Sequence, residues 1–147
     1  MKGFSKTRPY RILGGMKQRC MNPANAHYAN YGGRGIKVCD EWLGKDGAER
    51  FCDWALSHGY RDDLTIDRID NNQGYAPSNC AWMPQTINSS RNNMHLKLWY
   101  IINLVPQFEV DYLLPLIAKV ENEKDREDLM KKFHATQRSR TKRHPRK

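Results

Sequence analysis

The chain has 147 residues, which suffices for one modest domain with its own core but not for two of ordinary size. Its 25 Lys and Arg residues outnumber its 16 Asp and Glu residues, and the net charge of +9 favours a polyanionic partner, nucleic acid above all. Because no stretch reaches the roughly 18 apolar residues of a membrane span and the start lacks a secretory signal, we expect a cytoplasmic protein without a membrane partner.

Apolar spacing and turn residues predict the elements of the first part of the chain. We expect a helix from about Pro9 to Cys20, where apolar residues recur at helical intervals. The glycines of 32–35 permit a tight turn that leads into a short strand from Ile36 to Cys39. A second helix is expected from Asp46 to Ser57, and His58-Gly59 has the composition of its C-terminal cap.

The middle of the chain predicts a β-hairpin that is followed by a helix. The segment Leu64–Ile69 alternates apolar and polar residues like a half-buried strand, and 70–74 is rich in turn residues. The chain can return as a second strand from Cys80 to Met83. Proline suits the first turn of a helix, so we expect a helix that starts at Pro84 and ends near Pro106.

The C-terminal part is predicted to be helical and then irregular. An amphipathic stripe over 112–120 indicates a helix, and the mixed charges of 121–132 are typical of a solvated helical face. After about Phe133 we expect a disordered basic tail. The whole is an α+β fold, divided into a hairpin-containing domain over 1–95, a helical extension packed on that core over 96–132, and a tail over 133–147. The stripe either completes the core or forms a dimer face.

Three polar residues occur at defined places around the hairpin. Asp67 lies at the end of the first strand, Asn79 comes twelve residues later, just before Cys80-Ala81-Trp82, and Asn88 lies inside the following helix. With the glycine-rich segment 31–36, this order resembles the HNH, or ββα-metal, endonucleases of phages over roughly residues 9–94. The resemblance implies a small hairpin-and-helix core and a phage protein that works inside the host cell.

The resemblance also implies roles for the site residues. A divalent cation, magnesium or manganese, would bind Asp67 and Asn88, whose oxygen ligands suit a hard ion, and no small-molecule cofactor is expected. Arg68 stands where the family has its histidine base, and a guanidinium cannot accept a proton near neutral pH. Arg68 would instead hold the scissile phosphate. Asn79 either orients the base or ties the loop together by side-chain hydrogen bonds to the backbone.

Other interpretations of these residues stay open. His58 and His95 are substitute bases to consider, and Asp67 could form a salt bridge with Arg68 or Arg91 instead of binding a metal. The sequence holds four cysteines, whose default interpretation is that of small buried hydrophobic residues. A structural zinc site is an alternative, although the paired spacing of such sites is missing. The cysteines are Cys20, Cys39, Cys52 and Cys80.

The preferred hypothesis is a metal-dependent endonuclease that nicks or cleaves duplex DNA, with Asp67, Arg68, Asn79 and Asn88 as catalytic residues. The alternatives are a catalytically inactive DNA-binding protein with the same hairpin, and an RNA-associated basic protein. An alternative to nucleic-acid binding is that the basic ends of the chain only keep the protein soluble. Phosphate contacts, which weaken steeply with salt, are expected from basic residues near the hairpin and in the tail. These are Arg34, Lys37, Arg68, Arg91, Arg138, Arg140, Lys142, Arg143, Arg146 and Lys147.

Overall fold

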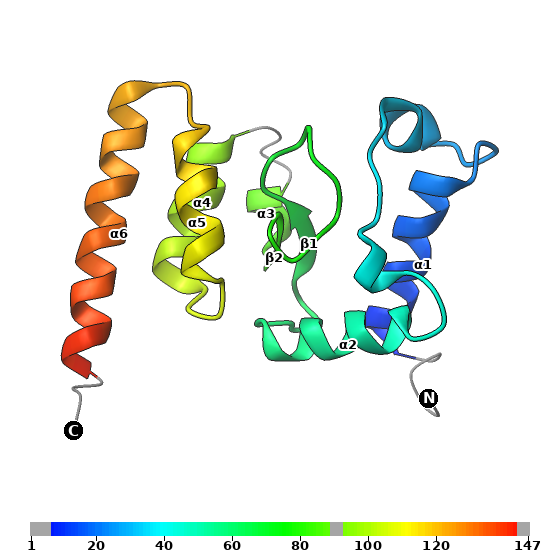
Figure 1. The fold of residues 1–147 in the computed structure, drawn as a ribbon, viewed down its shortest axis with the longest axis horizontal. Helices are drawn as coiled ribbons and strands as arrows, with labels where there is room; N and C mark the ends of the chain where they lie inside the picture. The colour runs from blue at the N-terminus through cyan, green and yellow to red at the C-terminus, as the bar shows by residue number, and fades with distance from the viewer. Residues whose placement is uncertain (1–6, 89–92, 144–147) are drawn as a thin grey trace.

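The fold was analysed in a computed structural model, which describes residues 7–88 and 93–143. Its elements are arranged as a central hairpin with helices on both sides (Figure 1). In chain order they are α1 (Arg8–Met21), three short 3-10 helices η2 (Tyr28–Asn30), η3 (Gly32–Arg34) and η4 (Asp40–Trp42), α2 (Gly47–Ser57), β1 (Thr65–Arg68), β2 (Cys80–Met83), α3 (Gln85–Asn88), α4 (Met94–Leu104), α5 (Val110–Ala118) and α6 (Glu123–Arg143). The predicted α+β class is confirmed.

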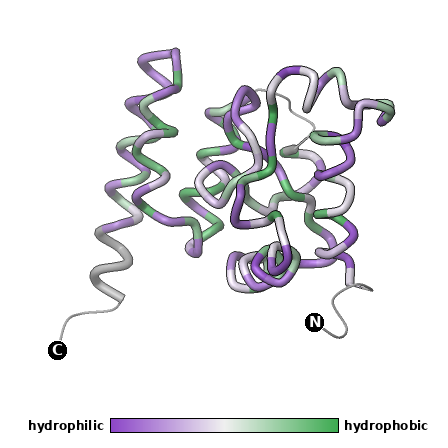
Figure 2. Tube along the Cα trace, turned by 45° about the vertical axis from the view of Figure 1, so that its right-hand side comes forward, coloured by the Kyte–Doolittle hydropathy of each residue, from purple (hydrophilic) through white to green (hydrophobic). Residues whose placement is uncertain are grey.

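The helices before and after the hairpin belong to two separate hydrophobic clusters. The first gathers residues of α1, η4 and α2 around aromatic side chains, among them Trp42, Phe51 and Trp82. The second gathers α4, α5 and α6 with residues of the hairpin segment. Along α5 and α6, hydrophobic and hydrophilic residues alternate in the manner of amphipathic helices (Figure 2). The hairpin thus lies between two cores and contributes to each.

The register of the hairpin explains how one short strand serves both cores. β1 and β2 are antiparallel, and Asp67 pairs with Ala81 while Arg68 pairs with Cys80. Successive side chains of a strand point to opposite faces of the sheet. Ala81 therefore packs in the cluster of the C-terminal helices, whereas Cys80 packs in the N-terminal cluster. The neighbours Asp67 and Arg68 are likewise directed to opposite sides of the hairpin.

Two helices and both strands of the sequence prediction agree closely with α1, α2, β1 and β2, but the strand predicted from Ile36 to Cys39 is wrong. Only an isolated parallel bridge joins Val38 to Tyr75 there. Its hydrogen bonds run from Tyr75 N to Lys37 O and from Cys39 N to Tyr75 O, each 2.8 Å long. The pairing stops at once because η4 begins at Asp40.

The single helix expected from Pro84 to Pro106 is also wrong. α3 ends at Asn88, and α4 starts anew with Asn93 as its N-cap. The Asn93 side chain accepts a hydrogen bond of 3.0 Å from the backbone N–H of Leu96, which is how asparagine caps a helix. A polar residue that satisfies a free N–H in this way favours a helix start rather than a helix interior.

The C-terminal part differs from the sequence prediction beyond residue 133. α6 continues to Arg143, where a disordered tail was expected, and its buried side chains Leu129 and Phe133 fix it to the neighbouring helices. The helix is hydrophilic overall, and that composition suggested disorder. Within the described residues, no helix is both long enough and apolar enough to cross a membrane.

Candidate functional site

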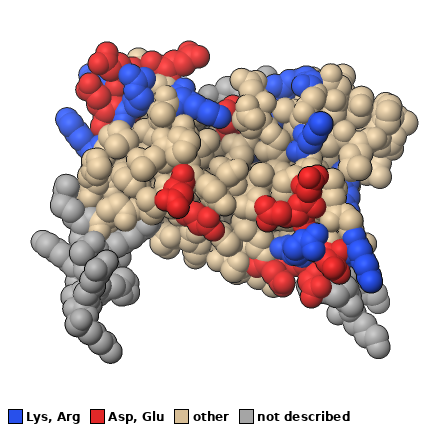
Figure 3. Space-filling view, viewed as in Figure 1, with Lys and Arg blue, Asp and Glu red and all other residues tan. Residues whose placement is uncertain are grey.

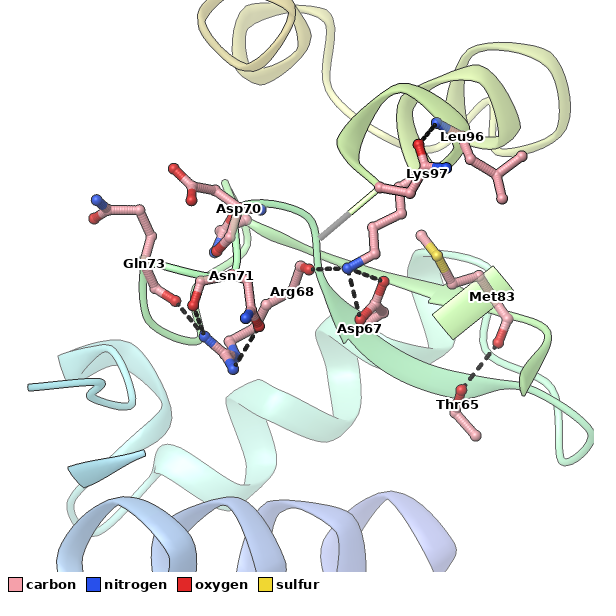
Figure 4. A network of polar contacts seen from close by, with 11 residues as sticks. Thr65, Asp67, Arg68, Asp70, Asn71, Gln73, Met83, Leu96 and Lys97 are labelled. Atoms are coloured by element: carbon pink, nitrogen blue, oxygen red, sulfur yellow. Dashed lines mark hydrogen bonds and ion pairs between the residues drawn. The ribbon is translucent and has the colours of Figure 1, made fainter. Parts of the chain in front are cut away.

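The carboxylate of Asp67, which the sequence assigns to a metal ion, lies against the ammonium group of Lys97 (Figure 4). Lys97 Nζ is 3.1 Å from Asp67 Oδ2 and donates a hydrogen bond of 3.4 Å to Oδ1. The same ammonium donates to the backbone carbonyl of Arg68 at 3.0 Å. Lys97 is 2% exposed and the Asp67 side chain 8% exposed, so the ion pair is buried.

The surroundings of Asp67 make its charge costly. Burial raises the pKa of Asp67 to about 6, against the opposing attraction of Lys97 and Arg68. A buried carboxylate is tolerated when a cation and hydrogen bonds compensate for lost hydration. Asp67 Oδ2 has the charge of Lys97 beside it but accepts no hydrogen bond from the described residues. The pair therefore holds the end of β1 to α4 electrostatically, with one oxygen incompletely satisfied.

These observations bear on whether Asp67 fits a divalent ion. Magnesium and manganese need an oxygen-rich shell with several open positions. Here a buried ammonium already lies against both carboxylate oxygens, and a second cation in the same place would be repelled. As arranged, the residues beside Asp67 do not fit a metal ion.

The guanidinium of Arg68 is bound within the hairpin loop. It donates to the backbone oxygens of Asn71 at 2.7 Å and Gln73 at 2.9 Å, and to Asn71 Oδ1 at 3.0 Å (Figure 4). Its central carbon lies 5.1 Å and 5.4 Å from the ring centroids of Tyr31 and Tyr75, within the range of cation–π attraction. Arg68 is buried and organises the loop, and it lines the cleft wall.

Asn79 ties the same loop together. Its Oδ1 accepts from the N–H of Asp70 at 2.8 Å, and its Nδ2 donates to the carbonyls of Asp70 and Gly74, each at 3.0 Å. The side chain is buried, so these bonds replace its contacts with water. Of the two roles that the sequence left open, this geometry supports the loop-tying one.

A polar cleft of about 740 Å³ opens beside the hairpin, between β1 with its loop and the segment around η2 and η3. The cationic residues that line it come from four elements or loops: Arg19 from α1, Arg34 from η3, Arg68 from β1 and Lys97 from α4. His27 also lines it. Among the described residues of its wall, Asp67 is the one acid, and Lys97 balances its charge. The cleft is therefore suited to an anion.

Two of these arginines are held in place by the aromatic and loop residues of the cleft wall. Arg19 donates to the hydroxyl of Tyr75 at 3.1 Å, and its central carbon lies 5.2 Å from the Tyr31 ring centroid. Arg34 is exposed and bonds to Asn72 Oδ1 at 3.0 Å. The Tyr31 and Tyr75 rings are nearly parallel, 7° apart, with centroids 6.4 Å apart. Cationic groups on rigid supports lose little freedom when they bind a phosphate.

Acidic side chains gather elsewhere on the surface. In the view of Figure 3 they lie over the turn between α5 and α6 and along α2. Residues of that turn include Glu121, Glu123 and Asp125. Because a polyanion would be repelled there, this distribution favours an approach to the cleft rather than to the α5–α6 turn.

Several residues that the sequence assigned to the site lie elsewhere or outside the described part. Lys37 is exposed and does not line the cleft. Asn88 ends α3, and its side chain is not described. Arg91, Arg146 and Lys147 lie outside the described residues, whereas the basic residues 138–143 lie on the last turns of α6 with side chains that are not described.

The two histidines considered as substitute bases do not line the cleft. His58 Nδ1 is 2.9 Å from Trp54 O and its ring stacks on Trp54, beside the end of α2. His95 Nε2 lies 3.4 Å from an oxygen of Asp128 on α6. His95 lines a second cavity together with Asp70, Asn71 and Asn72 of the hairpin loop. Neither histidine lies in the cleft that Asp67 and Arg68 line.

The cysteines are free thiols, and burial raises the pKa of each one. Over residues 7–88 and 93–143, no group of three or more His, Cys, Asp or Glu side chains is placed to hold a metal ion.

Sequence reasoning missed Lys97, Arg19, His27, Tyr31 and Tyr75. Lys97 carried a signal, because it stands four residues before Ile101 in an apolar segment and so shares the buried face of the helix. The other four meet only through the packing of α1 and η2 against the hairpin loop. No family model, curated protein or solved structure matches the chain.

Proposed function

We propose that the chain is a DNA-binding protein that holds the phosphodiester backbone in the cleft beside its hairpin. The observation that carries this proposal is the convergence of Arg19, Arg34 and Arg68 on one cleft whose single described acid, Asp67, is already paired with Lys97. Arginine forks match phosphate oxygens in pairs, and charged contacts to the backbone supply most of the affinity of such proteins.

The hairpin and α3 follow one another in the order of an HNH core, and we propose that this unit descends from such a core without its hydrolytic chemistry. Two residues support this view, because their chemistry differs from what hydrolysis requires at these places. Arg68 binds the loop where the family has a base, and Lys97 lies against the carboxylate that would bind the metal. The unit would then position DNA and not cut it.

Fluorescence anisotropy with a labelled duplex tests the binding proposal. The full chain should bind duplex DNA in EDTA, with an affinity that falls steeply as salt rises. Arg34→Gln should weaken binding, because Arg34 is exposed at the cleft. Arg61→Gln is the matched control, since Arg61 is an exposed arginine that pairs with Asp63 away from the cleft. Equal losses in both variants would refute the cleft as the binding surface, and tighter binding to RNA would favour the RNA-associated alternative.

The second candidate is metal-dependent cleavage of duplex DNA. One observation favours it: Asp67 Oδ2 is buried next to the cleft and accepts no hydrogen bond from the described residues, although the Lys97 ammonium lies 3.1 Å away. This function requires Lys97 to leave the carboxylate. Conversion of supercoiled plasmid in magnesium, manganese or EDTA separates the candidates. Nicking that needs a metal and disappears in Asp67→Asn would establish the nuclease, whereas binding without product supports the non-cleaving protein.

A further inference from the structure

Lys97 is an unusual residue for its position in the fold. It lies on α4 between hydrophobic neighbours, and α4 buries it together with Leu98, Ile101 and Ile102. A lysine ammonium removed from water is costly unless charges and hydrogen bonds replace its hydration. A helix that only packed against the hairpin would be more stable with an apolar residue here, so the ammonium requires a specific partner.

All the described partners of this ammonium come from the end of β1. They are the two carboxylate oxygens of Asp67 and the backbone oxygen of Arg68. Three oxygens of one strand end thus surround a single positive charge (Figure 4). An oxygen cage of this kind, with a carboxylate and a backbone carbonyl, is also what a hard metal cation selects. The ammonium and a metal ion would therefore compete for one place.

We propose that the ammonium of Lys97 occupies the cation position at the end of β1. It neutralises the Asp67 carboxylate and excludes divalent metal ions from that carboxylate. The chain thereby supplies its own counter-charge to Asp67 and needs no metal ion at this carboxylate. This inference goes beyond DNA binding and does not rest on it, because it concerns the occupancy of the Asp67 carboxylate in the free protein.

The second lysine–aspartate pair of the hairpin region provides a contrast. Lys119 Nζ lies 2.9 Å from Asp70 Oδ2, but the Lys119 side chain is 47% exposed. An exposed lysine can swing into water, whereas Lys97 has no such freedom. Lys119→Met is therefore a matched variant that releases a carboxylate of the same loop without touching the Asp67 position.

The test is manganese binding by the full chain without DNA. Binding is measured as a loss of the electron paramagnetic resonance signal of free Mn²⁺. The proteins compared are the wild type, Asp67→Asn, Lys97→Met, Lys119→Met and the double variant Lys97→Met/Asp67→Asn. We expect the wild type and Asp67→Asn to leave the Mn²⁺ signal unchanged. Lys97→Met should bind Mn²⁺, and the double variant should lose that binding because the carboxylate is gone.

Three results would overturn the assignment. They are Mn²⁺ binding by the wild type that Asp67→Asn abolishes, a folded Lys97→Met protein that binds no Mn²⁺, and an equal gain in Lys119→Met. Far-ultraviolet circular dichroism reports whether each variant is folded. If Lys97→Met does not fold, the comparison of the wild type with Asp67→Asn still decides, since a metal site in the wild type contradicts the proposal.

Discussion

Lys97 and Asp67 are 30 residues apart in the chain, yet their charged groups lie 3.1 Å apart in the interior. Removal of one partner leaves a buried charge without compensation, so Lys97→Met should lower the free energy of unfolding by about 3–5 kcal/mol. Replacement of both residues, in Lys97→Met/Asp67→Leu, should cost much less, because no charge is left behind. Urea denaturation of the wild type, Lys97→Met, Asp67→Leu and the double variant gives the coupling free energy between the two residues directly. Additive losses would show that the two groups do not interact.

The pKa of Asp67 predicts a pH dependence of stability. Burial raises this pKa from 3.8 in the unfolded chain to about 6, so between these values the folded protein retains a proton that the unfolded chain releases. The free energy of unfolding should therefore fall as the pH rises from about 4 to about 6. A separation of about two between the pKa values corresponds to at most about 3 kcal/mol.

Asp67→Asn cannot titrate, so it should lack this part of the fall. Urea denaturation of both proteins at a series of pH values checks the prediction, because contributions of the other groups cancel in the difference. A difference in stability that stays constant between pH 4 and pH 6 would contradict the raised pKa.

Arg68→Lys should destabilise the hairpin loop although it keeps the charge. A lysine cannot reproduce the forked donation to the oxygens of Asn71 and Gln73, nor the planar contact with the two tyrosines. The expected loss is about 1–3 kcal/mol. Arg34→Lys is the control, because Arg34 is exposed and its replacement should change stability by at most about 0.5 kcal/mol. Equal stabilities of the two variants would argue against the role of Arg68 in the loop.

Asn79→Ala should also loosen the loop, because it removes the partner of the Asp70 N–H and the Asn79 donor to the carbonyls of Asp70 and Gly74. The Asp70 carbonyl still accepts from the N–H of Gln73. A loss of about 3 kcal/mol is expected if water does not enter. Asn103→Ala serves for comparison, since the Asn103 side chain donates an exposed hydrogen bond to Trp99 O. Thermal unfolding measures both, and a loss in Asn79→Ala no larger than in Asn103→Ala would contradict the prediction.

The cleft predicts a particular salt dependence of DNA affinity. If Arg34 contacts one phosphate, Arg34→Gln should reduce the slope of log affinity against log salt by about 0.9. Arg61→Gln should leave the slope as it is, because Arg61 lies away from the cleft. Anisotropy titrations at several salt concentrations provide both slopes, and an unchanged slope in Arg34→Gln would remove Arg34 from the interface.

The elements that sequence predicted well are those whose signals are local. The apolar spacing of α1 and α2 and the alternation of β1 depend on near neighbours, and the structure agrees within a few residues. The failures had causes that lie outside the segment concerned. The segment 36–39 forms a single β-bridge, to Tyr75, among the described residues, and α6 is helical beyond 133 although its composition is that of a disordered tail. Tertiary packing decides such segments, and propensity alone does not.

In the candidate site, too, features with local sequence signals could be predicted, and contacts between distant segments could not. The polar residues of the hairpin, Asp67, Arg68 and Asn79, could be selected from sequence because they follow one another in a motif order. Their partners could not, since Lys97 comes from a later helix and Tyr31 from an earlier turn. The motif selected residues of the hairpin, of which Asp67 and Arg68 line the cleft, while the contacts of these residues come from distant segments.

The position of β2 between the two hydrophobic clusters affects how the protein unfolds. Its alternate residues fill two cores, Cys80 and Trp82 on one side and Ala81 and Met83 on the other. A fragment that ended at residue 95 would expose the second pair to water and would leave Asp67 without its ammonium partner. Neither half can lose its structure while the other keeps a complete core, so hydrogen exchange at the amides of β2 should report the global unfolding of the whole chain.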